Sequence, residues 1–225
     1  MRFVRGTLFY LMLAVILLIT ILPFLWMLSS SFKGQEAIRT IPIRWIPERP
    51  TLEGYERVFN MQGFSFTRAS LNSLLLAVGC TVAEVASSAM AAFVFAKLPF
   101  KGSGKVFGIY LATMMIPNTV TMVPNYIILR SLGLLDTYTG LILPYLGKAF
   151  SVFLMRQSML GVNDAYLESA FLDGASLYRV FWKIMLPMVT PTLATLTLIS
   201  FMGSWNSYLW PLIVLLSLIH ISEPT

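Results

Sequence analysis

The chain has 225 residues, of which 57% are hydrophobic and only 12% charged, and its formal net charge is +6. Soluble domains contain about 25% charged residues, so this composition indicates a membrane protein and argues against a soluble enzyme or a nucleic-acid-binding domain. The single cysteine, Cys80, and the single histidine, His220, exclude an intrachain disulfide and a metal cluster built from His and Cys.

Several apolar segments are long enough to cross a membrane, since a bilayer core requires about 20 apolar residues per helix. The predicted spans cover 7–29, 70–95, 106–124, 139–156 and 186–206. The first run is longer than the apolar part of a signal peptide and no small-residue cleavage site follows it, so we expect an uncleaved span. No segment alternates over about ten residues as the strands of a membrane barrel do. The expected fold is an all-α polytopic membrane protein, a helical bundle of five spans.

A proline-rich, charged segment separates the first two spans and sets the expected domain organisation. Residues 1–69 would form the N-terminal span and an extracytoplasmic loop, and residues 70–215 the transmembrane core. Basic residues on the two sides nearly balance, but the short lysine-rich loop at 97–105 favours a cytoplasmic N-terminus. The last residues, LSLIHISEPT at 216–225, look like translated adapter sequence, so we expect a non-native tail there.

A polar interruption at Leu167–Pro187 predicts a helix, a glycine turn and a second helix. One face of the second helix is apolar at positions i, i+3, i+4 and i+7, which are Leu177, Val180, Phe181 and Ile184. Gly174 stands where a helix would end in a left-handed cap, which glycine adopts without a steric penalty. Pro187 would end the second helix or begin the next. A membrane protein would use such a loop to bind a soluble partner; the alternative is an ordinary helical hairpin between spans.

The first helix of this loop offers an apolar patch beside an acidic side chain. The patch would consist of Tyr166, Leu167, Ala170 and Phe171. Its burial in a partner's cleft would stabilise a complex by several kcal/mol, at about 25 cal/mol per Å² of apolar surface. Glu168 would pair with a basic group of the partner, or it would remain a solvated carboxylate.

The same loop resembles the EAA loop of ABC importer permeases. The positions that match the motif are Glu168, Ser169, Ala170, Asp173, Gly174, Ala175, Ile184, Leu186 and Pro187. In that family the loop is the coupling helix, which docks into a cleft of the cytoplasmic ATPase subunit. The resemblance therefore implies that the loop at 163–187 is a cytoplasmic coupling helix that connects this chain to an ATPase.

Further segments are similar to the carbohydrate-uptake, or maltose-type, branch of these permeases. They are FVFAKLPFK at 93–101 and the segments 116–134, 136–144, 153–157 and 203–214. The resemblance implies the inner membrane component of a binding-protein-dependent transport system, here C-terminally truncated, since the family normally has a sixth span. The implied partners are a second permease subunit, two cytoplasmic ATP-binding subunits, an extracytoplasmic solute-binding protein and the lipid bilayer, with no nucleic acid. The implied location is a bacterial or archaeal plasma or inner membrane.

The expected function is that of a permease subunit in an ATP-driven importer for a sugar or a related polar solute. The chain is not expected to be an enzyme, because Gly102-Ser103-Gly104-Lys105 lacks the upstream glycine and the following hydroxyl of a phosphate-binding loop. ATP hydrolysis would then belong to partner subunits, and no cofactor, catalytic residue or metal ligand is expected. The alternative is a membrane scaffold or receptor whose cytoplasmic loop binds a soluble partner without transport.

Two charged residues fall near the centres of predicted spans, Glu84 in the second and Lys148 in the fourth. Such a position costs about 2.5–3.5 kcal/mol per charge on insertion scales. We hypothesise that the two side chains face the bundle interior and neutralise each other, or line a hydrated pore. Alternatively, the span boundaries differ from the prediction, or each charge has separate polar partners.

Side chains suited to sugar hydroxyls, or to stacking on a sugar ring, also occur in or beside the spans. The candidate substrate-pathway residues are Asn118, Asn125, Trp205, Asn206 and Tyr208. Prolines within spans often accompany cavities in transporters. Trp and Tyr are equally typical of the membrane interface, so packing or anchoring is the competing interpretation for each candidate.

Overall fold

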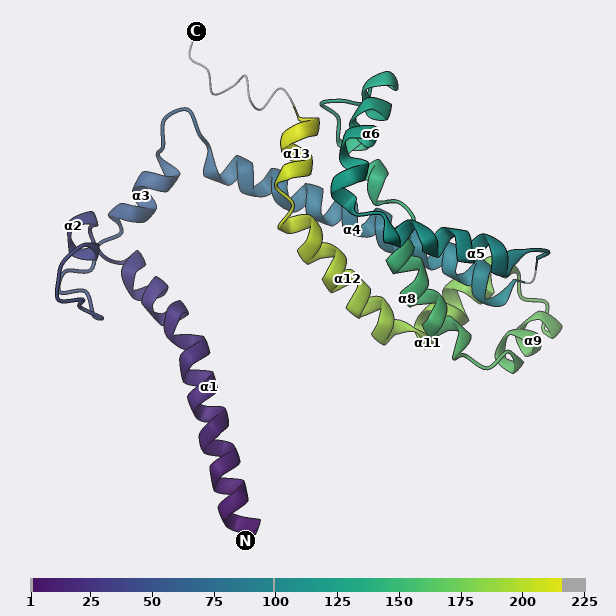
Figure 1. Ribbon diagram of the computed structural model, residues 1–225, viewed down its shortest axis with the longest axis horizontal. Helices are drawn as coiled ribbons and strands as arrows, with labels where there is room; N and C mark the ends of the chain where they lie inside the picture. The colour runs from purple at the N-terminus through teal and green to yellow at the C-terminus, as the bar shows by residue number, and fades with distance from the viewer. Residues whose placement is uncertain (1, 99, 216–225) are drawn as a thin grey trace. The chain divides into compact units, whose positions relative to one another are not determined.

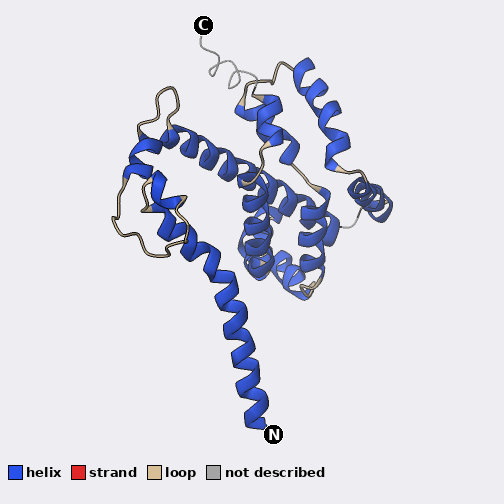
Figure 2. Cartoon of the chain, turned by 60° about the vertical axis from the view of Figure 1, so that its left-hand side comes forward, coloured by secondary structure: helices blue, strands red, loops and turns tan. Residues whose placement is uncertain are grey.

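The computed structural model describes residues 2–98 and 100–215, and every regular element within those ranges is a helix (Figure 1, Figure 2). The predicted all-α fold is therefore confirmed. Contacts group the chain into two compact units that divide between Ala69 and Ser70. The tail predicted to be non-native, 216–225, lies outside the described residues.

The first unit contains three helices, α1 (Arg2–Ser31), α2 (Gln35–Ile38) and α3 (Glu53–Phe59). α1 includes Phe9–Ser31, an apolar stretch of 23 residues that is long enough to cross a membrane. The most apolar window of this stretch is not buried.

The segment that joins α1 to α3 folds back onto the C-terminal end of α1. Tyr55 Oη donates a hydrogen bond to Ser31 Oγ over 2.9 Å. The rings of Trp26 and Trp45 meet edge to face, with their centroids 5.1 Å apart. These contacts hold the proline-rich segment in a defined position beside the end of the helix.

α4 (Phe66–Lys97) leads into the second unit, which also contains short 3-10 turns and one π-helical turn, η3. The remaining elements of this unit are α5 (Ser103–Ala112), η1 (Thr113–Met115), α6 (Asn118–Ser131), α7 (Tyr138–Ile142), η2 (Leu143–Tyr145), α8 (Ala149–Leu160), α9 (Ala165–Leu172), α10 (Leu177–Val180), η3 (Phe181–Met185), α11 (Leu186–Met188), α12 (Thr190–Trp205) and α13 (Leu209–Val214).

Among the described residues, two helices are long and apolar enough to cross a membrane unbroken, Phe9–Ser31 and Phe66–Lys97. Three further candidates are pairs of helices with a sharp bend, and counting each pair as one span gives up to five spans. The pairs are Ser103–Met115 with Asn118–Ser131 (103°), Tyr138–Tyr145 with Ala149–Leu160 (48°) and Leu177–Met188 with Thr190–Trp205 (82°). The predicted apolar segments are thus present, but the bounds predicted for the last three spans run across these breaks.

Local backbone chemistry explains the three breaks. Ile116 is extended (φ −88°, ψ 116°), as expected for a residue before a proline, and Pro117 then precedes α6. Gly147 has a φ of 61° between η2 and α8, a left-handed conformation that glycine adopts readily. Val189 departs from helical geometry (φ −106°, ψ 17°), and Pro191 follows in the first turn of α12, where its missing N–H is not needed.

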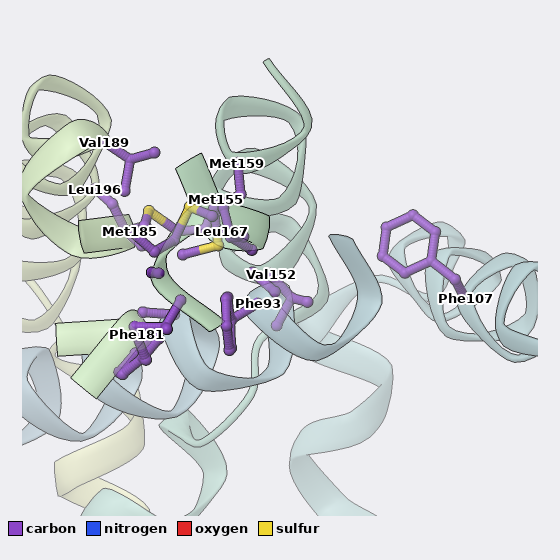
Figure 3. Packing of buried hydrophobic residues seen from close by; sticks show 14 residues of the cluster. Phe93, Phe107, Val152, Met155, Met159, Leu167, Phe181, Met185, Val189 and Leu196 are labelled. Atoms are coloured by element: carbon purple, nitrogen blue, oxygen red, sulfur yellow. The ribbon is translucent and has the colours of Figure 1, made fainter. Parts of the chain in front are cut away.

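The second unit has one large apolar core, formed by residues of α4, α5, α8, α9, α10, η3 and α12. Figure 3 shows Met155, Met159 and Met185 gathered within it. The rings of Phe93 and Phe181 lie beside them, with centroids 5.3 Å apart. Unbranched methionine side chains suit the irregular space where several short helices meet.

A smaller cluster of Leu129, Leu141 and Val214 connects α6, α7 and α13. Gly140 in α7 approaches the preceding turn so closely that an added Cβ would lie 2.1 Å from Leu134 O. This turn therefore cannot accept a larger residue at the glycine without a backbone shift.

Candidate functional site

The loop at 163–187 begins with α9, whose C-terminal end is fixed by two backbone hydrogen bonds. Gly174 N donates to Phe171 O over 3.0 Å, and Ala175 N donates to Ala170 O over 2.9 Å. These two bonds form a Schellman cap, and Gly174 has the left-handed φ, 78°, that this cap requires. The glycine turn therefore has the conformation expected from the sequence.

One side of α9 belongs to the protein's own core. Leu167 and Ala170 are buried, and Figure 3 shows Leu167 beside Met155 and Met185. The prediction that Leu167 and Ala170 form part of an apolar patch for a partner is therefore wrong. Their burial instead attaches α9 to the helices behind it.

The opposite side of α9 is exposed and carries both apolar and acidic groups. Leu172 is 88% exposed, and Tyr166 and Phe171 are exposed as well. The Glu168 carboxylate has no partner within residues 2–98 and 100–215. Large apolar side chains exposed on a polar loop are typical of an interaction surface. We call the exposed residues Tyr166, Glu168, Ser169, Phe171 and Leu172 the α9 face.

The second helix of the loop is continuous from Leu177 to Met188 but changes its winding at η3. Its buried residues are Val180, Phe181 and Met185. Ile184 is half-buried and Leu177 is exposed, so the apolar face begins one turn later than predicted. Pro187 lies in α11, directly after the wider π-helical turn, so it begins the next helical segment and the chain bends only at Val189.

The other residues that match the EAA motif are divided between the two sides of the loop. The half-buried ones pack against the core and are Ala175, Ile184 and Leu186. The exposed ones are Ser169, Asp173 and Pro187. The motif thus combines residues that hold the loop on the bundle with residues that face outward.

A buried lysine of α4 holds the start of the loop. Lys97 Nζ donates to Val162 O over 2.6 Å and to Asp164 Oδ1 over 2.5 Å, and its side chain is only 3% exposed. On α8, Arg156 Nε donates to Phe95 O over 3.1 Å. Both contacts join the region of α8 and α9 to the end of α4. The sequence did not reveal them, because a lysine at the end of a span is equally typical of a membrane interface.

Glu84 and Lys148 lie together between α4 and the start of α8. Lys148 Nζ is 2.8 Å from Glu84 Oε2, and Ser151 Oγ donates to Glu84 Oε1 over 2.6 Å. The Glu84 side chain is 4% exposed and that of Lys148 is 42% exposed. The Lys148 ammonium also lies 4.1 Å from the centroid of the Tyr145 ring. The buried carboxylate is thus compensated by one charge and one hydroxyl, as a buried acid requires.

The candidate substrate-pathway residues lie in two separate regions of the second unit. Asn118 and Asn125 belong to α6, the first exposed and the second half-buried. Trp205 ends α12, and Asn206 Nδ2 donates back to a carbonyl of the same helix over 2.8 Å. Tyr208 is exposed before α13. A role of these residues in solute passage stays a prediction. In the described part of the chain, no three His, Cys, Asp or Glu side chains lie together as metal ligands.

The sequence of this chain matches a known protein family over more than half of its length. Residues 85–221 match the family model described as "Binding-protein-dependent transport system inner membrane component". The chain belongs to this family. The matched range includes the whole 163–187 loop, and the resemblance to ABC importer permeases seen in the sequence is confirmed.

Curated relatives of this inner membrane component are transport permeases. It is 34% identical over 212 residues to the arabinooligosaccharides transport system permease protein AraQ of Bacillus subtilis (strain 168), covering 94% of this chain and 74% of AraQ. It is 38% identical over 144 residues to the sn-glycerol-3-phosphate transport system permease protein UgpE of Yersinia pestis bv. Antiqua (strain Antiqua), covering 64% and 51%. It is 32% identical over 195 residues to the diacetylchitobiose uptake system permease protein NgcG of Streptomyces coelicolor, covering 86% and 64%. The alternative of a non-transporting scaffold or receptor is therefore not favoured.

A solved structure has the same fold as this inner membrane component. It is the crystal structure of a bacterial ABC transporter involved in the import of the acidic polysaccharide alginate. One of its chains matches with a TM-score of 0.84 at 25% sequence identity, covering 94% of this chain and 74% of that chain. The helical bundle is therefore that of an ABC importer permease.

Proposed function

We propose that this chain is a permease subunit of an ATP-driven importer for a sugar or a related polar solute. The relatives are named for arabinooligosaccharides, sn-glycerol-3-phosphate and diacetylchitobiose, and the similar structure belongs to an importer of alginate. All of these solutes are rich in hydroxyl groups. The shared chemistry supports a hydroxyl-bearing solute for this chain as well.

Within such an importer, we assign the α9 face to docking on a cytoplasmic ATP-binding subunit. The observation that carries this assignment is the difference in exposure between the two sides of α9. Leu167 is buried in the core, whereas Leu172 is 88% exposed. A partner that uses only the outer side would leave the anchoring side undisturbed. The assembly would contain a second permease subunit, two ATP-binding subunits that hydrolyse ATP and an extracytoplasmic solute-binding protein. The N-terminus of this chain would be cytoplasmic.

The contacts of α9 indicate how a movement of the ATP-binding subunit would reach the spans. Leu167 packs in the core with residues of α8 and η3, and Lys97 ties the α8–α9 turn to α4. α8 in turn packs against α12. A displacement of α9 would therefore move α4, α8 and α12 together, because a close-packed core transmits strain rather than absorbing it.

The test is Leu172→Asp in the complete transporter. Leu172 is so exposed that the substitution should leave packing within the chain intact, but it would place an unpaired charge in a docking contact. We expect the affinity for the ATP-binding subunits to fall at least about tenfold, the equivalent of about 1.4 kcal/mol. Co-purification and solute-stimulated ATP hydrolysis in proteoliposomes measure this loss.

Leu132→Asp is the matched control. Leu132 is also an exposed leucine at a helix end, but it follows α6, on the side of the membrane that we place opposite the α9 face. Loss of the ATP-binding subunits in both variants would indicate a general assembly defect and contradict the docking assignment. Unchanged association in Leu172→Asp would contradict it too.

A further inference from the structure

We propose that the segment after α1 forms a binding site for the headgroup phosphate of an anionic phospholipid. The site is a pocket of about 170 Å³ in the first unit. Its lining combines three basic side chains and one acidic side chain with polar and apolar ones; the charged residues are Lys33, Arg44, Arg49 and Glu48. This inference concerns a region apart from the α9 face and does not depend on the docking assignment.

The pocket follows directly on a membrane span. The apolar stretch of α1 ends at Ser31, and Lys33 comes two residues later. Trp26 and Trp45 pair beside it, and tryptophan is enriched where a span meets the headgroups. The pocket therefore lies at the depth of phospholipid phosphates, whichever way α1 crosses the membrane.

Positive charge exceeds negative charge in the pocket lining. Arg44 pairs with Glu48, while Lys33 and Arg49 have no acidic partner among the described residues. Lys33 is 4% exposed, and its Nζ donates to Arg44 O over 2.5 Å and lies 4.1 Å from the Trp26 ring centroid. This ammonium keeps further donors for an anion, and the Arg49 guanidinium offers a planar pair of donors that matches phosphate oxygens.

Exposed isoleucines in the segment that forms the pocket, one of which (Ile46) lines it, favour a lipid over a soluble anion. Ile41 is 94% exposed, and Ile43 and Ile46 are exposed as well, interleaved with the arginines of the same segment. Such a mixture of apolar and basic side chains is typical of a surface that rests on an anionic bilayer, with the apolar groups among the acyl chains. A free phosphate ion would use the basic groups alone.

The test is native mass spectrometry of the complete transporter, titrated with phosphatidylglycerol or phosphatidylcholine. We expect the wild type to retain phosphatidylglycerol in preference to phosphatidylcholine. Arg49→Gln should weaken phosphatidylglycerol binding about fivefold, because one basic group near a membrane surface contributes about 1 kcal/mol. Arg49 has no hydrogen bond or ion pair within residues 2–98 and 100–215, so its removal should leave the fold and the binding of phosphatidylcholine unchanged.

Arg39→Gln is the matched control, because Arg39 is an exposed arginine of the same segment that does not line the pocket. Unchanged binding of phosphatidylglycerol by Arg39→Gln, together with the about fivefold weaker binding by Arg49→Gln, supports the site. Equal losses in the two variants would mean diffuse attraction to charge and overturn it. Displacement of the lipid by an equal concentration of inorganic phosphate would overturn the lipid as ligand. A weaker affinity of Arg49→Gln for the solute-binding protein, with lipid binding unchanged, would also overturn the proposal.

Discussion

The Glu84 carboxylate shows how a single charge is accommodated inside this bundle. Each of its oxygens has a partner from outside α4, Lys148 Nζ for Oε2 and Ser151 Oγ for Oε1. Ser87 Oγ, one turn along α4, accepts a hydrogen bond from Gly147 N over 2.9 Å. The contacts of Glu84 with Lys148 and of Ser87 with Gly147 both lie at the break between η2 and α8. The polar groups of α4 therefore hold the bend of the fourth span in place.

Lys148→Met should destabilise the protein by about 1–3 kcal/mol, because it leaves the Glu84 carboxylate buried without a counter-charge. Breaking a fully buried pair costs about 3–5 kcal/mol, and the smaller figure reflects the 42% exposure of the Lys148 side chain. Thermal unfolding of the detergent-purified transporter measures the effect. In a double-mutant cycle with Glu84→Gln, the double variant should regain much of the loss. Simple addition of the two single losses would show that the pair is not coupled.

Among the helices, α9 is held in place at both ends and in the middle. Its start is held by the buried Lys97 of α4, and its end by the Schellman cap at Gly174. The core holds the middle through Leu167 and Ala170. Few residues of this short helix are therefore free to move independently, which suits an element that transmits force.

Gly174→Ala should destabilise the turn after α9 by about 1 kcal/mol, since a left-handed conformation costs an alanine roughly 1–2 kcal/mol. An added Cβ would meet open space at this position, so the cost is one of backbone strain alone. We expect a lower thermal midpoint and weaker solute-stimulated ATP hydrolysis. Gly104→Ala is the control, because Gly104 lies in α5 without a left-handed φ and with open space around it. Alanine should be neutral or slightly stabilising there; an equal loss in both variants would refute the argument.

For the whole molecule, the proposed cytoplasmic N-terminus determines on which side each loop lies. The loops at 97–105 and 161–176 would then share the cytoplasmic side, and the loop at 131–138 would lie opposite. The α9 face can meet an ATP-binding subunit only in this orientation. In this orientation the lysine-rich loop at 97–105 lies on the cytoplasmic side, where basic loops usually lie.

Cysteine labelling tests this arrangement in intact cells. A cysteine introduced for the exposed residue Lys101, which lies outside the α9 face, should resist a membrane-impermeant maleimide until the membrane is permeabilised, whereas Ser131→Cys should react at once. The natural Cys80 is buried, so the background should be low. Labelling of Lys101→Cys in intact cells, with Ser131→Cys protected, would contradict the proposed orientation.

The helical fold and the family could be predicted from the sequence because they rest on local properties. Apolar runs of span length, the proline at 117 and the glycine at 174 each act through the residues next to them. The paths of the spans could not be predicted in the same way. A hydropathy window averages over a break, so it finds the apolar segment around Pro117 but not the 103° bend.

The apolar segments, the glycine turn of the loop and the motif of an importer permease can all be predicted from neighbouring residues in the sequence. Which side of α9 faces outward depends instead on the tertiary structure. Leu167 and Leu172 are the same residue type on the same helix, yet one is 5% and the other 88% exposed. The tertiary structure also brings Lys97 to a carbonyl 65 residues away and Glu84 to Lys148. The physical reason is that burial and pairing depend on contacts between distant segments, whereas apolar length and backbone preference do not.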